Sequence, residues 1–93
     1  MPVVRRDISF EVAEEVAVGT LLAAVRKRVP GFVREVEVFD QYRGKGVEPG
    51  TKSLALRIVM QDTDRTLTDS EVEAVMASVR DLLNQQFQAR PRT

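Results

Sequence analysis

Residues 52–61 read Lys-Ser-Leu-Ala-Leu-Arg-Ile-Val-Met-Gln, and this stretch decides the fold class. One face of it carries the four apolar side chains Leu54, Leu56, Ile58 and Met60. Alternation with a period of two is typical of a β-strand that buries one face. Residues 68–71, Thr-Asp-Ser-Glu, then have the capping-box pattern of a helix N-terminus, and apolar residues follow at spacings of three and four up to Phe87. The sequence therefore predicts a half-buried strand followed by a long amphipathic helix.

The rest of the chain adds two strands, one helix and a tail that can form a short last strand. Residues 3–12 and 32–42 alternate as strands do, and residues 18–29 carry one apolar helical stripe that a Pro-Gly pair ends. Residues 43–50 contain three glycines and one proline and are predicted to form a loop. Residues 88–93 suit a short final strand, which the proline within it confines to a sheet edge. The order β-α-β-β-α, with a possible last strand in the tail, predicts one α+β domain over the whole chain, a ferredoxin-like split βαβ sandwich with two helices on one face of an antiparallel sheet.

The alternation also assigns the two faces of the sheet. The face under the helices is expected to carry apolar residues, namely Ile8, Phe10, Val36, Leu56 and Ile58. The other face is expected to be open, with Ser9, Glu11, Phe39, Ser53 and Arg57.

Composition excludes several classes of function. Fourteen basic and fourteen acidic residues cancel, which argues against a general nucleic-acid coat because phosphate neutralisation supplies that kind of affinity. The chain has no cysteine and no histidine, so disulfides, thiolate chemistry and the commonest general base are excluded. No apolar run is long enough to span a membrane, and the expected location is the cytoplasm. Gly44-Lys45-Gly46 does not open a helix, as a phosphate loop must, so no catalytic residue and no metal site are predicted.

One group of residues suits a chemical role. Residues 39–44, Phe-Asp-Gln-Tyr-Arg-Gly, end one strand where Lys52 and Ser53 begin the next. An unpaired base can stack on Tyr42, and Asp40 can accept hydrogen bonds from a guanine's N1 and N2. Arg43, Lys45 and Lys52 would then lie near phosphates. A plain hairpin end with a loop cap and a half-buried tyrosine explains the same residues.

The order of four motifs resembles a known family. They are Arg-Asp-Ile-Ser-Phe at 6–10, Phe-Asp-Gln-Tyr-Arg-Gly at 39–44, Gly-Thr-Lys-Ser-Leu-Ala at 50–55 and Arg-Thr-Leu-Thr-Asp-Ser-Glu-Val at 65–72. This order is similar to that of the ferredoxin-fold anticodon-binding domain at the C-terminus of the β subunit of bacterial phenylalanyl-tRNA synthetase. The fourth motif needs no RNA to explain it, because it has the pattern of a helix start.

The resemblance implies RNA recognition by a non-catalytic module. It implies that Tyr42 stacks on the first anticodon base, a guanine, while Asp40 and Ser53 form hydrogen bonds near it and Ser9 lies close by. It also implies a contribution from an arginine in the tail, where Arg90 and Arg92 flank a proline.

The resemblance also implies the partners. These are the anticodon stem-loop of tRNA(Phe), the rest of a longer β subunit and the α subunit of the heterotetrameric enzyme. ATP and magnesium would belong to the parent enzyme, and no cofactor is expected in this chain.

Strict alternation conflicts with this site. Asp40 and Tyr42 share their parity with Val36 and Val38, so they are expected to face the helices, whereas Ser53 faces the open side. Either a bulge shifts the strand before Asp40, or the base lies over the end of the sheet.

Two other functions use the same fold. A small-ligand regulatory domain would form its site at a dimer interface. A protein-interaction module would use the open face, although the charges there argue against a large apolar interface.

Overall fold

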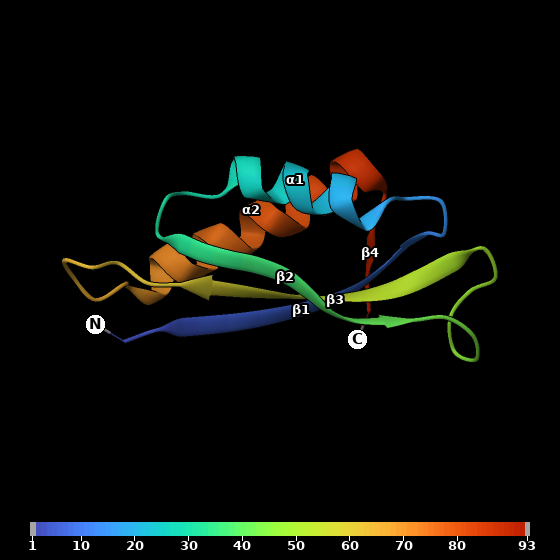
Figure 1. Cartoon of the computed structure of the whole chain (residues 1–93), viewed down its shortest axis with the longest axis horizontal. Coiled ribbons are helices and arrows are strands. Elements are labelled where there is room, and N and C mark those ends of the chain that lie inside the picture. The colour runs from blue at the N-terminus through green and yellow to red at the C-terminus, as the bar shows by residue number, and fades with distance from the viewer. Residues whose placement is uncertain (1, 93) are drawn as a thin grey trace.

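The computed structural model describes residues 2–92 and contains two helices and four strands. In chain order these are β1 (Val4–Ala13), α1 (Val18–Arg28), β2 (Val33–Tyr42), β3 (Thr51–Met60), α2 (Asp69–Phe87) and β4 (Arg90–Pro91). The strands form one sheet in the order β2-β3-β1-β4, and all its pairings are antiparallel. Both helices lie on the same side of this sheet (Figure 1). The predicted ferredoxin-like α+β fold is confirmed.

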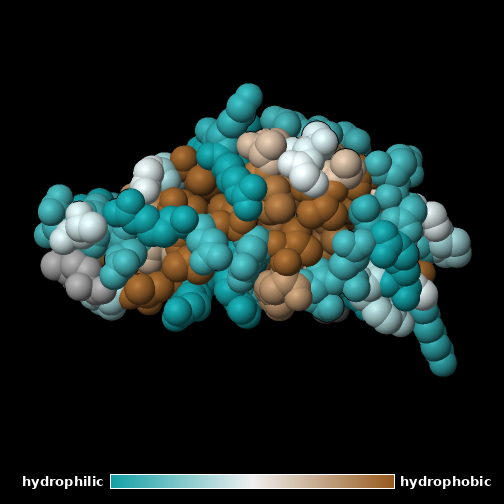
Figure 2. Space-filling view, viewed as in Figure 1, coloured by the Kyte–Doolittle hydropathy of each residue, from teal (hydrophilic) through white to brown (hydrophobic). Residues whose placement is uncertain are grey.

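The core lies between the helices and the inward face of the sheet. Phe10, Val36, Leu56 and Ile58, all predicted to face inward, are at most 3% exposed. Each such side chain stabilises the fold by about 1.5–3 kcal/mol when it leaves water. The helices contribute their own buried residues, which are Leu21, Val25, Val72, Val75, Met76, Val79, Leu82 and Leu83. Figure 2 shows apolar residues gathered across the middle of one side of this sandwich, with hydrophilic residues at both ends.

Helix α1 ends where the sequence predicted a stop. Val29 has extended backbone angles, φ −77° and ψ 152°, because the ring of Pro30 disfavours the helical conformation in the residue before it. Arg26, in the last turn, donates a hydrogen bond to the carbonyl of Val36 at 2.7 Å. This bond ties the end of α1 to β2.

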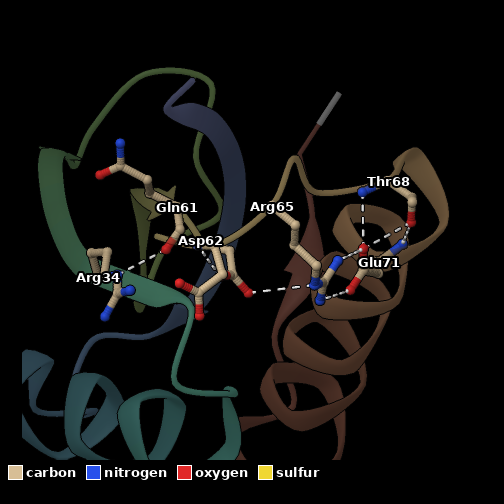
Figure 3. Close-up of polar contacts among 7 residues, drawn as sticks. Arg34, Gln61, Asp62, Arg65, Thr68 and Glu71 are labelled. Carbon is tan, nitrogen blue, oxygen red and sulfur yellow. Dashed lines mark hydrogen bonds and ion pairs between the residues drawn. The ribbon is translucent and has the colours of Figure 1, made fainter. Parts of the chain in front are cut away.

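Helix α2 begins with the predicted capping box. The hydroxyl of Thr68 accepts from the backbone N–H of Glu71 at 3.1 Å, and the Glu71 carboxylate accepts from the N–H of Thr68 at 2.9 Å. Arg65 pairs with both oxygens of the same carboxylate, and Asp62 lies 3.6 Å from the Arg65 guanidinium (Figure 3). The motif that begins at Arg65 therefore fixes the entry into α2 by side-chain contacts within the fold.

The other end of α2 delivers β4 to the edge of the sheet. Gln88 adopts a left-handed conformation, φ 54°, which turns the chain out of the helix. Arg90 and Pro91 then pair with Glu11 and Phe10 of β1. The tail, for which the sequence allowed a short last strand, thus forms one at Arg90–Pro91, and its proline lies at the sheet edge.

We expect the contacts of Glu71 to make stability depend on pH. Hydrogen bonds, first from Arg65 and then from Thr68, lower the pKa of Glu71 from 4.5 to about 2. A lowered carboxyl pKa contributes stability that is complete above the ordinary pKa and is lost as pH falls through the folded value. The difference in free energy of unfolding between wild type and Glu71→Gln should therefore shrink between about pH 5 and pH 2.

Urea unfolding followed by circular dichroism at several pH values measures this difference. Glu73→Gln is the matched control, because it removes an exposed carboxylate from the same helix without these contacts. A Glu71→Gln difference that stays constant from pH 7 to pH 2.5 would contradict the prediction.

Candidate nucleic-acid interface

A β-bulge in β2 sets the facing of the predicted site residues. Val38 pairs with Leu56, but Asp40 already pairs with Ala55, so β2 has one residue more than β3 at this point. The extra residue is Phe39. Tyr42 accordingly pairs with Ser53, and both Asp40 and Tyr42 lie on the open face of the sheet. The expectation from strict alternation, that they face the helices, is wrong because it assumes a strand without a bulge.

The open face holds a hollow at the end of the sheet near the loop of residues 43–50. Its volume is about 420 Å³, which falls within the usual range for small-ligand sites. The lining residues come from three strands and the tail, and they are Ser9, Asp40, Tyr42, Ser53 and Arg92. All five were singled out by the motifs and the resemblance, Arg92 as one of two candidate arginines in the tail. Strand register explains why these residues lie together. Ala55 of β3 pairs with Ser9 of β1 on one side and with Asp40 of β2 on the other.

Tyr42 is held in one orientation although the residue is 42% exposed. Its hydroxyl donates a hydrogen bond to the carbonyl of Lys45 at 2.7 Å. This turn requires glycine, since Gly44 and Gly46 have φ values of +116° and +90°. The Arg92 guanidinium carbon lies 5.7 Å from the ring centroid, close enough for a cation–π interaction. A flat aromatic surface is thus fixed at one side of the hollow.

The polar groups of the hollow differ in their accessibility. Asp40 is exposed, and within residues 2–92 its carboxylate has no hydrogen-bond or ion-pair partner. Ser53 is only 7% exposed. An ionised carboxylate accepts hydrogen bonds and cannot donate them. Asp40 therefore offers free acceptors to any donor that enters the hollow.

The structure gives the two arginines of the tail different positions. Arg90 forms ion pairs with Glu48, at 2.5 Å, and with Glu11, at 3.6 Å. The backbone N–H of Arg92 donates to the carbonyl of Ser9 at 3.0 Å, and its side chain lines the hollow. Arg90 thus anchors the tail, and Arg92 is the tail cation in the site.

Arg43 and Lys52 do not line the hollow. Arg43 forms a double hydrogen bond with the carboxylate of Glu14, which lowers the pKa of that carboxyl. Lys52 is 5% exposed, and its ammonium donates to the carbonyl of Val16 at 2.7 Å. The same ammonium lies 3.7 Å from Glu14. Both cations therefore tie the segment between β1 and α1 to the start of β3 and the loop before it.

Sequence reasoning missed two carboxylates that hold arginines near the hollow, Glu14 with Arg43 and Glu48 with Arg90. Glu14 lies 29 residues from Arg43, and Glu48 lies 42 residues from Arg90. No local spacing signals a pair this far apart, so only the folded chain reveals it.

Together these features define a class of protein. It is a split βαβ domain whose open sheet face presents a fixed aromatic ring, a free carboxylate, two hydroxyls and a cation in one hollow. Residues 1–92 match the family described as the ferredoxin-fold anticodon binding domain. The chain belongs to this family.

Individual relatives agree with that assignment. The phenylalanine–tRNA ligase β subunit of Thiobacillus denitrificans is 52% identical over 80 residues, which are 86% of this chain and 10% of that protein. The protein of the same name from Xanthomonas axonopodis pv. citri is 48% identical over 92 residues, 99% of this chain and 12% of that protein. The chain thus spans only 10–12% of the length of these curated relatives.

Among residues 2–92, neither helix has the length and apolar character needed to cross a membrane. The same residues contain no group of three or more acidic, histidine or cysteine side chains placed to hold a metal ion.

The placement of Lys52 predicts a role in stability. Lys52→Met leaves the carbonyl of Val16 without its charged donor, which we expect to lower the free energy of unfolding by about 1–3 kcal/mol. Lys45→Met makes the same chemical change at an exposed loop residue and should shift it by less than about 0.5 kcal/mol. Urea denaturation of both variants measures the difference, and equal stabilities would contradict a structural role for Lys52.

Proposed function

We propose that this chain binds the anticodon stem-loop of tRNA(Phe) and reads its first anticodon base, a guanine. The observation that carries the proposal is the hollow itself, where a fixed ring and a free carboxylate face one space. Membership of an anticodon-binding family supports it. The proposed role is recognition without catalysis.

In this proposal the guanine leaves the stack of the RNA loop and lies on the ring of Tyr42. Single-stranded bases stack well on aromatic rings, and a ring already held by its hydroxyl loses little freedom on binding. The Asp40 carboxylate accepts from the N1–H and N2–H groups of the base. This pairing matches two donors with two acceptors, whereas adenine presents an acceptor at N1.

The other residues of the hollow have supporting roles. Ser9 and Ser53 offer hydroxyls that can donate or accept as the base edge requires. Arg92 supplies a positive charge beside the ring, suited to a phosphate or to a base oxygen.

Phosphate contacts are proposed for the exposed cations around the hollow. Lys45 is exposed in the loop next to Tyr42. Arg43 has a side chain that is 49% exposed but must share its guanidinium with Glu14. The ammonium of Lys52 is buried, so we assign this residue to the fold.

We infer that the chain works as part of a larger phenylalanine–tRNA ligase. The relatives carry that name and are much longer than this chain. The attachment of phenylalanine, with ATP and magnesium, would take place outside these residues, and the partners would be the rest of the β subunit and the α subunit. A net charge of zero provides no general attraction to RNA, so we expect weak binding by the chain alone and tighter binding through other contacts of the enzyme. The cytoplasmic location stays a prediction.

Removal of the ring tests the stack. Tyr42→Ala should weaken binding of an anticodon stem-loop by about 1–3 kcal/mol, or about 5- to 150-fold in Kd. Tyr42→Phe is the matched control, because it keeps the ring and loses only the hydrogen bond to Lys45. Titration of the labelled chain with RNA at low salt, followed by amide chemical shifts, measures both. Wild-type affinity in a folded Tyr42→Ala chain would contradict the role of Tyr42.

A change of base tests the carboxylate. Inosine lacks the N2 amino group of guanine, so wild type should prefer guanine over inosine at the first anticodon position. Asp40→Asn replaces one of the two acceptor oxygens with a donor and should remove most of that preference, which is worth about 1.5–3 kcal/mol for one hydrogen bond to a charged group. Glu37→Gln, on the same strand outside the hollow, should keep it. A guanine preference that survives in Asp40→Asn would exclude the proposed contact.

A further inference from the structure

Next to the hollow, the open face carries a second exposed aromatic ring, that of Phe39. It is 44% exposed and is one of three large apolar side chains exposed within residues 2–92, with Val3 and Tyr42. Phe39 is the extra residue of the bulge. The planar end of the Arg57 side chain lies over it, with its central carbon 4.3 Å from the ring centroid.

Arg57 is oriented from two sides. Its guanidinium forms a double hydrogen bond with the Asp7 carboxylate, at 3.0 and 3.2 Å, while its plane contacts the ring of Phe39. Asp7 lies directly opposite Arg57 in the pairing of β1 with β3. These contacts form one ordered stack of a ring and a guanidinium on an otherwise polar face.

This stack lies beside the hollow on the same face. Arg57 follows Ala55 by two residues on β3, and the neighbours of Ala55 on the two adjacent strands, Ser9 and Asp40, line the hollow. Two residues along a strand span about 7 Å. An RNA strand that leaves the hollow along β3 therefore meets Phe39 and Arg57 next.

We propose that Phe39 and Arg57 form a second stacking platform, which takes the base of a nucleotide adjacent to the one in the hollow. The inference rests on the proposed function and extends it to a second nucleotide. Bases stack on aromatic rings and on arginine planes whatever their identity, because every base has a flat face. The contact with Asp7 uses two of the five N–H donors of Arg57 and holds its plane against the ring of Phe39, so stacking is the contact proposed for the platform. It contributes affinity, and the hollow contributes selectivity.

Phe39→Leu tests the platform, because it keeps an apolar side chain and removes the flat ring. The RNA is an anticodon stem-loop with the fluorescent base 2-aminopurine placed in turn on each side of the first anticodon position. Stacking quenches this base. Phe39→Leu should raise Kd about 5- to 100-fold and abolish the quenching at one of the two flanking positions. The preference for guanine over inosine at the first position should stay as in wild type.

Controls separate this role from others. Val3→Ala trims another exposed apolar residue and should change neither Kd nor fluorescence. Circular dichroism establishes that each variant is folded at the temperature of binding. A folded Phe39→Leu chain with wild-type Kd and quenching would overturn the platform. The ring of Phe39 would then have a role only in the bulge and none in RNA binding. Loss of the guanine preference would also overturn it, because Phe39 would then shape the hollow.

The test also distinguishes the platform from the function on which it rests. If Tyr42→Ala weakens binding and Phe39→Leu does not, the platform fails and the proposed reading of the first base stands. If Phe39→Leu removes the quenching while Tyr42→Ala leaves affinity and guanine preference unchanged, the platform stands and the proposed reading fails.

Discussion

Successive side chains of a strand point to opposite faces, so a single extra residue changes the face for every residue that follows it. In β2 that residue is Phe39. Before it, Val36 packs into the core; after it, Asp40 and Tyr42 lie on the open side. Without the bulge, a carboxylate would face the apolar layer under the helices, at a large cost in free energy. The bulge thus lets one strand serve the core at one end and the site at the other.

The surroundings of the hollow depend on ion pairs that join distant segments. Glu14 holds Arg43 just beyond β2, and Glu48 holds Arg90 in the tail. The loop between β2 and β3 is therefore fixed near both of its ends, and the tail is fixed to the loop. Arg90 is occupied in this way, and Arg92, which its backbone N–H ties to Ser9, lines the hollow. The cations of this region divide between holding the fold and facing the site.

The charge balance sets what kind of recognition the domain can perform. With fourteen basic and fourteen acidic residues, many of them paired on the surface, long-range attraction to a polyanion is weak. In the proposed function, discrimination then depends on short-range contacts, such as stacking and hydrogen bonds inside the hollow. This suits a module that spans about a tenth of the length of its relatives, in which other segments can supply general affinity.

The sequence by itself determined the order of the elements, the core residues, the capping box at Thr68 and the motif residues Asp40 and Tyr42 as a candidate site. These features are local. Burial of one face of a strand or helix makes apolar residues recur at a fixed spacing, and a capping box joins two residues three positions apart. Only the tertiary structure decided that Asp40 faces outward, that Arg92 and not Arg90 enters the hollow, and that Lys52 is buried. Each of these depends on strand register and on contacts between residues tens of positions apart, about which a local pattern holds no information.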